Sequence, residues 1–239
     1  MENQPVIVYE DNQIIVAMKQ PGQLTQSDIT GDRDLLSQIK EYVKEKYNKP
    51  GEAFIGLVHR MDRPVGGLLV FARTSKAAAR LSEQVRCHAL QREYVCVCEG
   101  ETPDHFTLKD YLKKDEETNM VSVLPDYLKA EGKLAILHGR TIAHKEGTSL
   151  CAIQLETGRG HQIRVQMQHF GHPLCGDLRY GHGVAGQVIA LYGMRLTLEH
   201  PTQHDKRIFM APPPQTVLFR PFERELEALE IAWPNFIKE

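Results

Sequence analysis

A single aspartate, Asp62, stands in a short polar segment between two apolar runs, within residues 57–72. Arg60 and Arg63 flank this acid, and Pro64 and two glycines follow it closely. A carboxylate beside cationic groups stays ionised, and it can stabilise or capture a developing positive charge. Apolar runs rich in Leu and Val are typical of buried strands, so the polar segment is predicted to be a tight, well-anchored loop. We therefore interpret Asp62 as a candidate catalytic acid, while an aspartate taken alone is more often a structural residue that caps a turn.

A second stretch, residues 157–181, contains more Gly, His, Gln and Arg residues than a purely structural segment needs. Histidines gather in and just after it, at His161, His169, His172 and His182. Such spacing is compatible with metal ligands, but no paired carboxylate or cysteine completes a ligand set, and Gly171 interrupts the helix that would align the imidazoles. We therefore expect no metal site.

The two stretches share a further property, because both match the motifs of one known family. Residues 59–63 and 158–164 together resemble the RluA-type RNA pseudouridine synthases. Further matching segments extend the resemblance over nearly the whole chain: residues 8–11, residues 19–22, residues 92–94, Leu191, and His200 with Pro201. Several ordered and correctly spaced motifs make the signal specific.

The resemblance implies a fold and a set of site residues. The family fold is α+β, with a mixed, mostly antiparallel central sheet, flanking helices and a central RNA-binding cleft. Asp62 matches the catalytic aspartate of the family, Tyr94 its active-site tyrosine against the target base, and Arg164 the basic residue that pairs with the aspartate. Leu191 falls where the family places an apolar residue under the base. The family uses no metal and no cofactor, nucleotide cofactors included.

The chemistry of uridine isomerisation agrees with these roles. The N1–C1′ bond must break and C1′ must rejoin through C5, so positive charge develops on the sugar, where a carboxylate can act. An arginine opposes the rise in pKa that burial imposes on such a carboxyl, and Arg164 is the best candidate. The base must leave its stack, and Tyr94 and Leu191 offer a platform and a shelf. The remaining candidates are expected to contact the RNA or to brace the loops: His59, Arg60, Arg63, Arg159, His161 and Gln162.

Departures from the family pattern are few. Met61 replaces the usual Leu, Gly66 the usual Ser or Thr, and Gly160 the usual Thr, while Tyr192 and Gly193 stand where His-Ala is common. None alters the three candidate catalytic residues, so we expect retained activity with altered loop rigidity or substrate fit.

The distribution of charge says more about partners than the total does. The net charge is -2, yet basic residues concentrate around the Asp62 stretch. Between residues 58 and 94 they are Arg60, Arg63, Arg73, Lys76, Arg80, Arg86 and Arg92. Such asymmetry favours one phosphate-binding face, although a basic helix face is often merely exposed to solvent.

The chain shows no signs of export or membrane insertion. Its 5 cysteines are odd in number and contain no Cys-x-x-Cys pair, so a disulfide framework is not expected. Residues 1–5 lack a basic and apolar signal segment, and no apolar run approaches membrane-spanning length. We expect a cytoplasmic protein without a membrane partner.

The elements that must position the candidate residues are expected to form one compact α+β catalytic domain over residues 1–239, and we expect no small N-terminal RNA-binding module. Predicted strands cover residues 6–9, 14–18, 92–98, 106–112, 120–124, 135–143, 149–155, 188–191 and 194–198, with residues 106–143 expected to form an antiparallel meander. Predicted helices cover residues 34–47, a segment from Thr74 or Ser75 to about 86, 161–170, and a segment from Pro221 to about Ala232. Residues 200–214 are expected to be a polar loop.

The sequence thus predicts an RNA pseudouridine synthase, an isomerase that converts specific uridines in structured ribosomal or transfer RNA, acting as a monomer. The alternative is a non-catalytic protein that binds or folds RNA on the same scaffold. Retention of Asp62, Tyr94 and Arg164 together favours the enzyme, since a pure binder has no need of an acid in a phosphate-attracting cleft.

Overall fold

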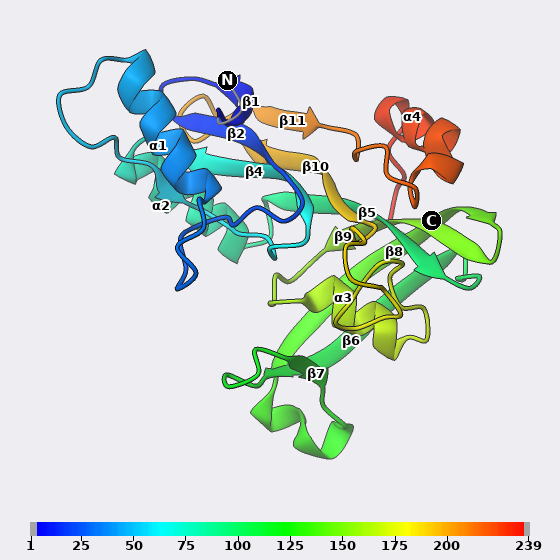
Figure 1. Cartoon of the computed structure of the whole chain (residues 1–239). Coiled ribbons are helices and arrows are strands. Elements are labelled where there is room, and N and C mark those ends of the chain that lie inside the picture. Colours follow the sequence, from blue (N-terminus) through cyan, green and yellow to red (C-terminus); the bar gives the residue numbers. More distant parts are fainter. Residues whose placement is uncertain (1–3, 237–239) are drawn as a thin grey trace. The chain divides into compact units, whose positions relative to one another are not determined.

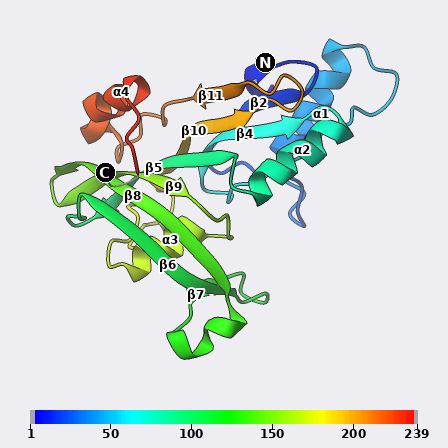
Figure 2. The same ribbon diagram turned by 180° about the vertical axis from the view of Figure 1, so that it is seen from behind.

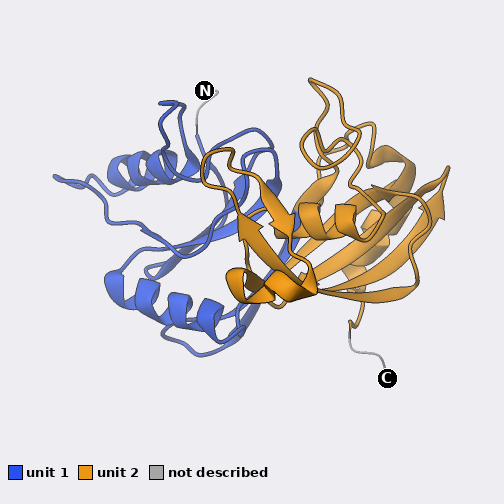
Figure 3. Ribbon diagram, turned by 90° about the horizontal axis from the view of Figure 1, so that it is seen from below, with its two compact units in different colours: residues 1–91, 193–211 blue, residues 92–192, 212–239 orange. Residues whose placement is uncertain are grey.

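The computed structural model describes residues 4–236 of the chain. These residues form two compact units, which Figure 3 distinguishes by colour. Unit 1 comprises Met1–Gln91 and Gly193–Ala211, and unit 2 comprises Arg92–Tyr192 and Pro212–Glu239. We expected no signal segment in residues 1–5, and residues 1–3 of that segment lie outside the described part. Within that part, no helix combines the length and hydropathy that a bilayer crossing requires.

Unit 1 is a mostly antiparallel sheet with one helix on each face (Figure 1). Its strands are β1 (Val6–Glu10), β2 (Ile14–Lys19), β3 (Gly56–Leu57), β4 (Gly66–Ala72), β10 (Leu191–Glu199, which enters the unit at Gly193) and β11 (Lys206–Met210). Its helices are α1 (Leu35–Lys46) and α2 (Ser75–Arg86). β2 pairs with β1 and β4, β3 pairs with β4, and β11 pairs with β10, all antiparallel.

Alternation along β2 and β4 divides the core of unit 1 into two layers. Ile14 and Val16 of β2 face the same side as Ala77 and Leu81 of α2, in a cluster completed by Leu68, Val70, Ala72, Leu90, Leu196, Leu198 and Ala211. The intervening residues of β2 and β4 face α1, in a cluster formed by Ile15, Ala17, Leu35, Ile39, Val43, Ala53, Ile55, Leu69 and Phe71. Side chains alternate between the faces of a strand, so strands covered on both sides read as continuous apolar runs. The chain on the C-terminal side of the Asp62 loop is therefore anchored in core.

Both predicted helix starts in unit 1 are confirmed. The Asp34 side chain accepts a hydrogen bond from the backbone N–H of Ser37 at 2.9 Å, and the Thr74 hydroxyl accepts one from Ala77 at 3.1 Å. Each side chain satisfies a donor that the first helical turn leaves without an intrahelical partner.

Two predictions about the last strands of unit 1 are wrong. We expected Tyr192 and Gly193 to interrupt a strand, but β10 runs through them without a break, and residues 188–190 precede it as irregular chain. The backbones of β4 and β10 lie close together here, because a Cβ added to Gly67, which has φ +137°, would lie 2.5 Å from backbone atoms of Gly193. The expected polar loop at residues 200–214 contains β11, a short strand whose half-exposed residues carry little apolar periodicity.

Unit 2 is built on a long antiparallel ribbon (Figure 2). Its strands are β5 (Gln91–Glu99, with Gln91 in unit 1), β6 (His105–Lys114), β7 (Val121–Val123), β8 (Lys133–Lys145) and β9 (Thr148–Leu155), in the order β5-β9-β8-β6-β7. Its helices are η1 (Asp126–Glu131), α3 (Gln162–His169), η2 (Arg220–Phe222) and α4 (Glu223–Ile231). The meander is only partly confirmed, because the 3₁₀ turn η1 returns the chain so that β8 pairs with β6 instead of β7.

Helix α3 packs on this ribbon and ends as predicted. Val165 and Tyr180 share a core cluster with Leu112, Val121 and Ala135 of the ribbon. At its C-terminus, Gly171 has φ +89°, and the backbone N–H groups of Gly171 and His172 donate to Gln168 and Met167 at 3.1 and 3.0 Å. This is a Schellman motif, which needs a residue in the left-handed region.

All five cysteines are free thiols, with Cys87 exposed and the others buried. The strand pairings and helices make the chain a mixed α+β protein with a mostly antiparallel sheet, which confirms the expected fold class. The single catalytic domain and the RNA cleft stay predictions.

Candidate functional site

Asp62 lies in unit 1 on the loop between β3 and β4. The residue is partly exposed, and its carbonyl oxygen accepts a hydrogen bond from the backbone N–H of Val65 at 3.1 Å, which closes a tight turn. The loop is therefore an ordered turn that leads directly into the buried strand β4, as the sequence predicted.

Lys19, at the end of β2, is a fully buried lysine beside this loop. Its Nζ donates to the carbonyl oxygens of Gln20 and Arg63 at 3.1 and 3.0 Å. Burial lowers the pKa of Lys19 to about 7, although the negative charge of Asp62 opposes this shift. Lys19 begins residues 19–22, one of the segments that resemble the family, but it was not a predicted site residue. The one available signal was its place at the end of a strongly apolar strand.

The segment that follows β2 braces both sides of Asp62. The Thr25 hydroxyl lies 3.1 Å from the carbonyl oxygen and 3.3 Å from the backbone nitrogen of Met61. The backbone N–H of Gly22 donates to Arg63 at 2.9 Å, and the Arg63 Nε donates back to Gly22 at 3.1 Å. Arg63 also forms an exposed ion pair with Asp32 at 2.6 Å. Arg63 thus acts as a brace of the loop.

The other two candidates near Asp62 are placed differently from each other. His59 is buried, and its Nε2 accepts a hydrogen bond from the backbone N–H of Val70 at 3.3 Å, so it ties the loop to β4. Arg60 is exposed and can meet a phosphate group from solvent.

Unit 2 holds the other candidate catalytic residues. Tyr94 lies in the buried run of β5 and pairs in register with Ile153 of β9. Leu191 is the first residue of β10 and is also buried. Both candidates for holding the base therefore sit on strands, which fix side chains more firmly than loops do.

Arg164, on α3, is held by a carboxylate that the sequence analysis did not single out. Its Nε donates to Asp177 Oδ2 at 2.8 Å and its Nη2 to Asp177 Oδ1 at 2.7 Å. Its guanidinium carbon lies 5.1 Å from the centre of the Tyr180 ring. Burial by itself raises the pKa of Asp177, yet the hydrogen bonds and charge of Arg164, with the N–H groups of Arg179 and Tyr180, hold that pKa below its ordinary value.

The polar side chains of the turn before α3 form hydrogen bonds with other residues of unit 2. Gln162 is buried, and its Oε1 accepts from the Thr157 hydroxyl and from the backbone N–H of Arg159, both at 2.9 Å. Arg159 is exposed and donates from Nε to the carbonyl oxygen of Leu134 at 2.9 Å. His161 has φ +55°, and its Nδ1 lies 2.7 Å from the Tyr180 hydroxyl. These contacts give Gln162 and His161 structural partners and leave Arg159 facing solvent.

The remaining histidines of this region have separate partners. His172 Nδ1 lies 2.9 Å from the Glu99 carbonyl oxygen, His182 pairs with the Glu99 carboxylate at 2.9 Å, and His169 is exposed. Among residues 4–236, no three His, Cys, Asp or Glu side chains converge as ligands of one metal ion.

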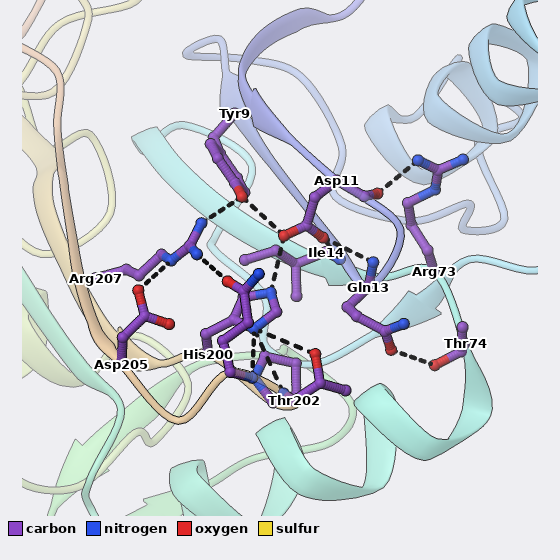
Figure 4. A network of polar contacts seen from close by, with 12 residues as sticks. Tyr9, Asp11, Gln13, Ile14, Arg73, Thr74, His200, Thr202, Asp205 and Arg207 are labelled. Atoms are coloured by element: carbon purple, nitrogen blue, oxygen red, sulfur yellow. Dashed lines mark hydrogen bonds and ion pairs between the residues drawn. The ribbon is translucent and has the colours of Figure 1, made fainter.

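A second polar network lies in unit 1 (Figure 4). The buried His200 donates from Nε2 to Asp11 at 2.8 Å, while its Nδ1 accepts from the backbone N–H of Gln203 at 3.1 Å. Asp11 also accepts from the Tyr9 hydroxyl, at 2.8 Å, and from the backbone N–H groups of the β1–β2 turn. The network fastens the β1–β2 turn to the β10–β11 turn, so we assign it a structural role.

Each unit therefore gives one predicted residue partners that were not predicted. Lys19 lies near Asp62 in unit 1, and Asp177 and Tyr180 contact Arg164 in unit 2.

The known proteins that this chain resembles are pseudouridine synthases. The family model described as RNA pseudouridylate synthase matches residues 13–169. Ribosomal large subunit pseudouridine synthase D of Salmonella typhimurium is 33% identical over 231 residues, which cover 89% of this chain and 68% of that protein. The protein of the same name from Pseudomonas aeruginosa is 31% identical over 230 residues, covering 89% and 69%. An uncharacterised RNA pseudouridine synthase of Bacillus subtilis is 31% identical over 212 residues, covering 87% and 72%.

Two solved human structures share the fold. Human RNA Pseudouridylate Synthase Domain Containing 4 superposes with a TM-score of 0.72 at 17% identity, covering 96% of this chain and 95% of its own. Human RNA Pseudouridylate Synthase Domain Containing 1 gives 0.70 at 20% identity, covering 95% and 96%.

Proposed function

Because the chain belongs to the RNA pseudouridylate synthase family, we propose that it isomerises specific uridines of ribosomal RNA, with Asp62 as its catalytic carboxylate. The protein is an RNA pseudouridine synthase, an isomerase. Ribosomal RNA is the preferred substrate class in this proposal because relatives that align along most of the chain carry the name ribosomal large subunit pseudouridine synthase.

The reaction needs charge stabilisation and positioning. The N1–C1′ bond breaks, the freed uracil turns, and C5 bonds to C1′ in its place. The proton at C5 then leaves, and N1 takes up a proton, so atoms and charge balance without an oxidant or reductant. A carboxylate near C1′ can stabilise the positive charge of the cleavage step or capture it covalently.

One observation carries the assignment to Asp62. Its carboxylate sits on a braced loop whose charge acts on the buried Lys19, in a segment that matches the family motif. A fixed loop holds the carboxylate in one position before the substrate arrives, which lowers the entropic cost of reaching the transition state.

The other roles follow from chemistry and from the resemblance. Tyr94 supports the displaced base and Leu191 forms the shelf beneath it, since a base outside its stack needs flat and apolar neighbours. Arg164 supplies the positive charge that keeps the catalytic carboxylate ionised. Arg60 and Arg159, both exposed, contact RNA phosphates.

The same proposal covers the partner, the oligomeric state and the cellular location of the protein. RNA is the partner, the chain acts as a monomer, and the site of action is the cytoplasm, where ribosomal RNA is modified. Light scattering of the purified protein with and without RNA would measure the stoichiometry, and a stable dimer would contradict the monomer.

A tritium-release assay tests the function directly. Ribosomal and transfer RNA transcripts carrying uridine labelled with tritium at C5 are incubated with the wild-type chain, with Asp62→Ala, and with Asp115→Asn as a control at an exposed aspartate in unit 2. We expect release from ribosomal RNA by the wild type and the control, and none by Asp62→Ala. Release that persists in Asp62→Ala would remove Asp62 from the chemistry, and release from transfer RNA alone would overturn the substrate class.

A further inference from the structure

We propose that Asp177 and Tyr180 are positioning residues that fix the guanidinium of Arg164 for the reaction. This inference rests on the proposed function, in which Arg164 supplies a counter-charge. It assigns roles to two residues that the family resemblance left without one, and all of its contacts lie within unit 2.

Asp177 determines the plane in which the guanidinium lies. Its two carboxylate oxygens receive Nε and Nη2, at 2.8 and 2.7 Å, which is the paired geometry that a planar guanidinium forms with a carboxylate. Two parallel hydrogen bonds prevent rotation about the Cδ–Nε bond. They also set the direction in which the opposite edge of the group, with Nη1, points.

Asp177 is itself immobilised. Its side chain is fully buried, and Oδ1 accepts further hydrogen bonds from the backbone N–H groups of Arg179 and Tyr180, at 2.9 and 3.1 Å. A carboxylate with four donors around it cannot follow the arginine if the arginine moves. The turn at residues 177–180 therefore acts as a fixed mount for Arg164.

Tyr180 packs against one face of the Arg164 guanidinium. Its ring lies under the guanidinium, at 5.1 Å from ring centre to carbon, and its hydroxyl accepts from the backbone N–H of Val121 at 2.9 Å. The same hydroxyl forms a hydrogen bond with His161 Nδ1 at 2.7 Å. The ring is thus held by β7 on one side and by the residue that precedes α3 on the other.

Stability alone explains this arrangement poorly. A buried ion pair loses about as much free energy through desolvation as it gains, so apolar residues of similar volume would serve a core equally well. A site that must present one edge of a cation in one direction does need a planar, doubly hydrogen-bonded partner. The negative charge of Asp177 also weakens the electrostatic effect of Arg164 on other charged groups.

The test compares Asp177→Asn and Tyr180→Phe with the wild type in the tritium-release assay. Thr102→Val serves as the matched control, because Thr102 is buried in unit 2 and bonds to Thr141 and Cys151 instead of to the Arg164 cluster. For Asp177→Asn we expect kcat to fall roughly ten- to hundredfold while KM for RNA stays within about twofold, because misplacement of a charged group costs chiefly transition-state stabilisation. For Tyr180→Phe, which keeps the ring and loses the hydroxyl, we expect a fall of about threefold or more, by the same reasoning.

Two readouts separate positioning from a loss of fold. Asp177→Asn removes a negative charge beside Arg164, so the acid limb of the pH profile of kcat should move to lower pH, whereas partial unfolding would leave that midpoint in place. In the folded wild type, the Arg164 Nε–H resonance should exchange slowly with water, and in both variants it should exchange faster. A kcat for Asp177→Asn within twofold of the control, or a rapidly exchanging Nε–H in the wild type, would overturn the inference. Should Asp177→Asn fail to fold, Tyr180→Phe and the wild-type resonance still decide.

The outcome is distinguishable from failure of the proposed function. If Asp62→Ala is inactive while Asp177→Asn matches the control, only the positioning role falls. If the wild type releases no tritium from any RNA, the proposed function falls, and the Nε–H exchange still reports whether Asp177 and Tyr180 hold Arg164.

Discussion

Replacing Lys19 with methionine should change how the stability of the fold depends on pH. Lys19 is completely buried, and burial lowers its pKa from 10.5 to about 7. In the unfolded chain the side chain is in water and its pKa returns to the ordinary value. Between these two values the unfolded state binds more protons than the folded state, so the free energy of unfolding rises with pH in this window.

The magnitude follows from the two pKa values. At pH 7 half of the folded molecules carry the Lys19 charge, and at pH 9 about one in a hundred does, while the unfolded chain stays protonated throughout. The folded state therefore gains a factor of roughly fifty, which is about 2 kcal/mol of stability between pH 7 and pH 9. Below pH 6 Lys19 is protonated in both states, and its contribution to the slope vanishes.

Urea unfolding at pH 6, 7, 8 and 9 measures this effect as a difference between proteins. We expect the wild type to gain about 2 kcal/mol relative to Lys19→Met between pH 7 and pH 9, whereas Lys49→Met, at an exposed lysine, should follow the wild type. A constant difference between wild type and Lys19→Met across this range would refute the reasoning, as would an Nζ titration near the ordinary lysine value.

Deprotonation of Lys19 should leave the loop in place. A neutral amine retains two N–H bonds, enough for the carbonyl oxygens of Gln20 and Arg63 that Nζ now reaches. Because the Asp62 charge raises the pKa of Lys19, Asp62→Ala should lower that pKa further, and the same titration in the variant checks this.

Three further substitutions probe the packing of the scaffold by urea unfolding. Gly67→Ala should destabilise by about 2–5 kcal/mol, because φ is +137° and the new Cβ would overlap the Gly193 backbone; a cost under 1 kcal/mol would contradict this account. Gly160→Thr, which restores the residue usual in the family, should change stability by less than about 0.5 kcal/mol, since its Cβ meets nothing within 4 Å; a large loss would mean that the turn is tighter than described. His200→Ala should cost about 1–3 kcal/mol through the lost bond to Asp11, and an unchanged midpoint would show that the turns hold without it.

The sequence predicted those elements whose signals are local. Candidate caps can be read from the sequence, Asp32 or Asp34 for α1 and Thr74 or Ser75 for α2, because a capping side chain acts within three residues of itself. The structure selects Asp34 and Thr74. Gly171 could be placed at the end of α3 for the same reason. The continuity of β10 could not be foreseen, because a glycine within an apolar run often marks a break, and the neighbouring strands β4 and β5 lie far away in the chain.

The same limit applies to the site. Asp62 was identified by its motif and by the apolar strands around its loop, whereas the roles of Lys19 and Asp177 come from long-range contacts. Lys19 reaches across 44 positions to Arg63, and Asp177 lies 13 positions after Arg164 on a separate turn. No periodicity or cap signal reports such a pairing, although a lysine ending an apolar strand and an acid in a Gly-rich stretch were both visible.

Unit 1 is formed by two separate stretches of the chain, and this affects the order in which the protein folds during its synthesis. Its core facing α2 includes Leu196 and Leu198, and its two turns are fastened by Asp11 and His200, 189 positions apart. A nascent chain that has left the ribosome only as far as Gln91 contains both helices and β4, but it lacks Leu196 and Leu198 of β10, which complete the core facing α2. The first part of unit 2, Arg92–Tyr192, is synthesised before that gap is filled, so the N-terminal segment must wait, with apolar surface exposed, until Gly193–Ala211 emerges. Synthesis therefore imposes an order of events in which the first part of the chain to appear completes its folding late.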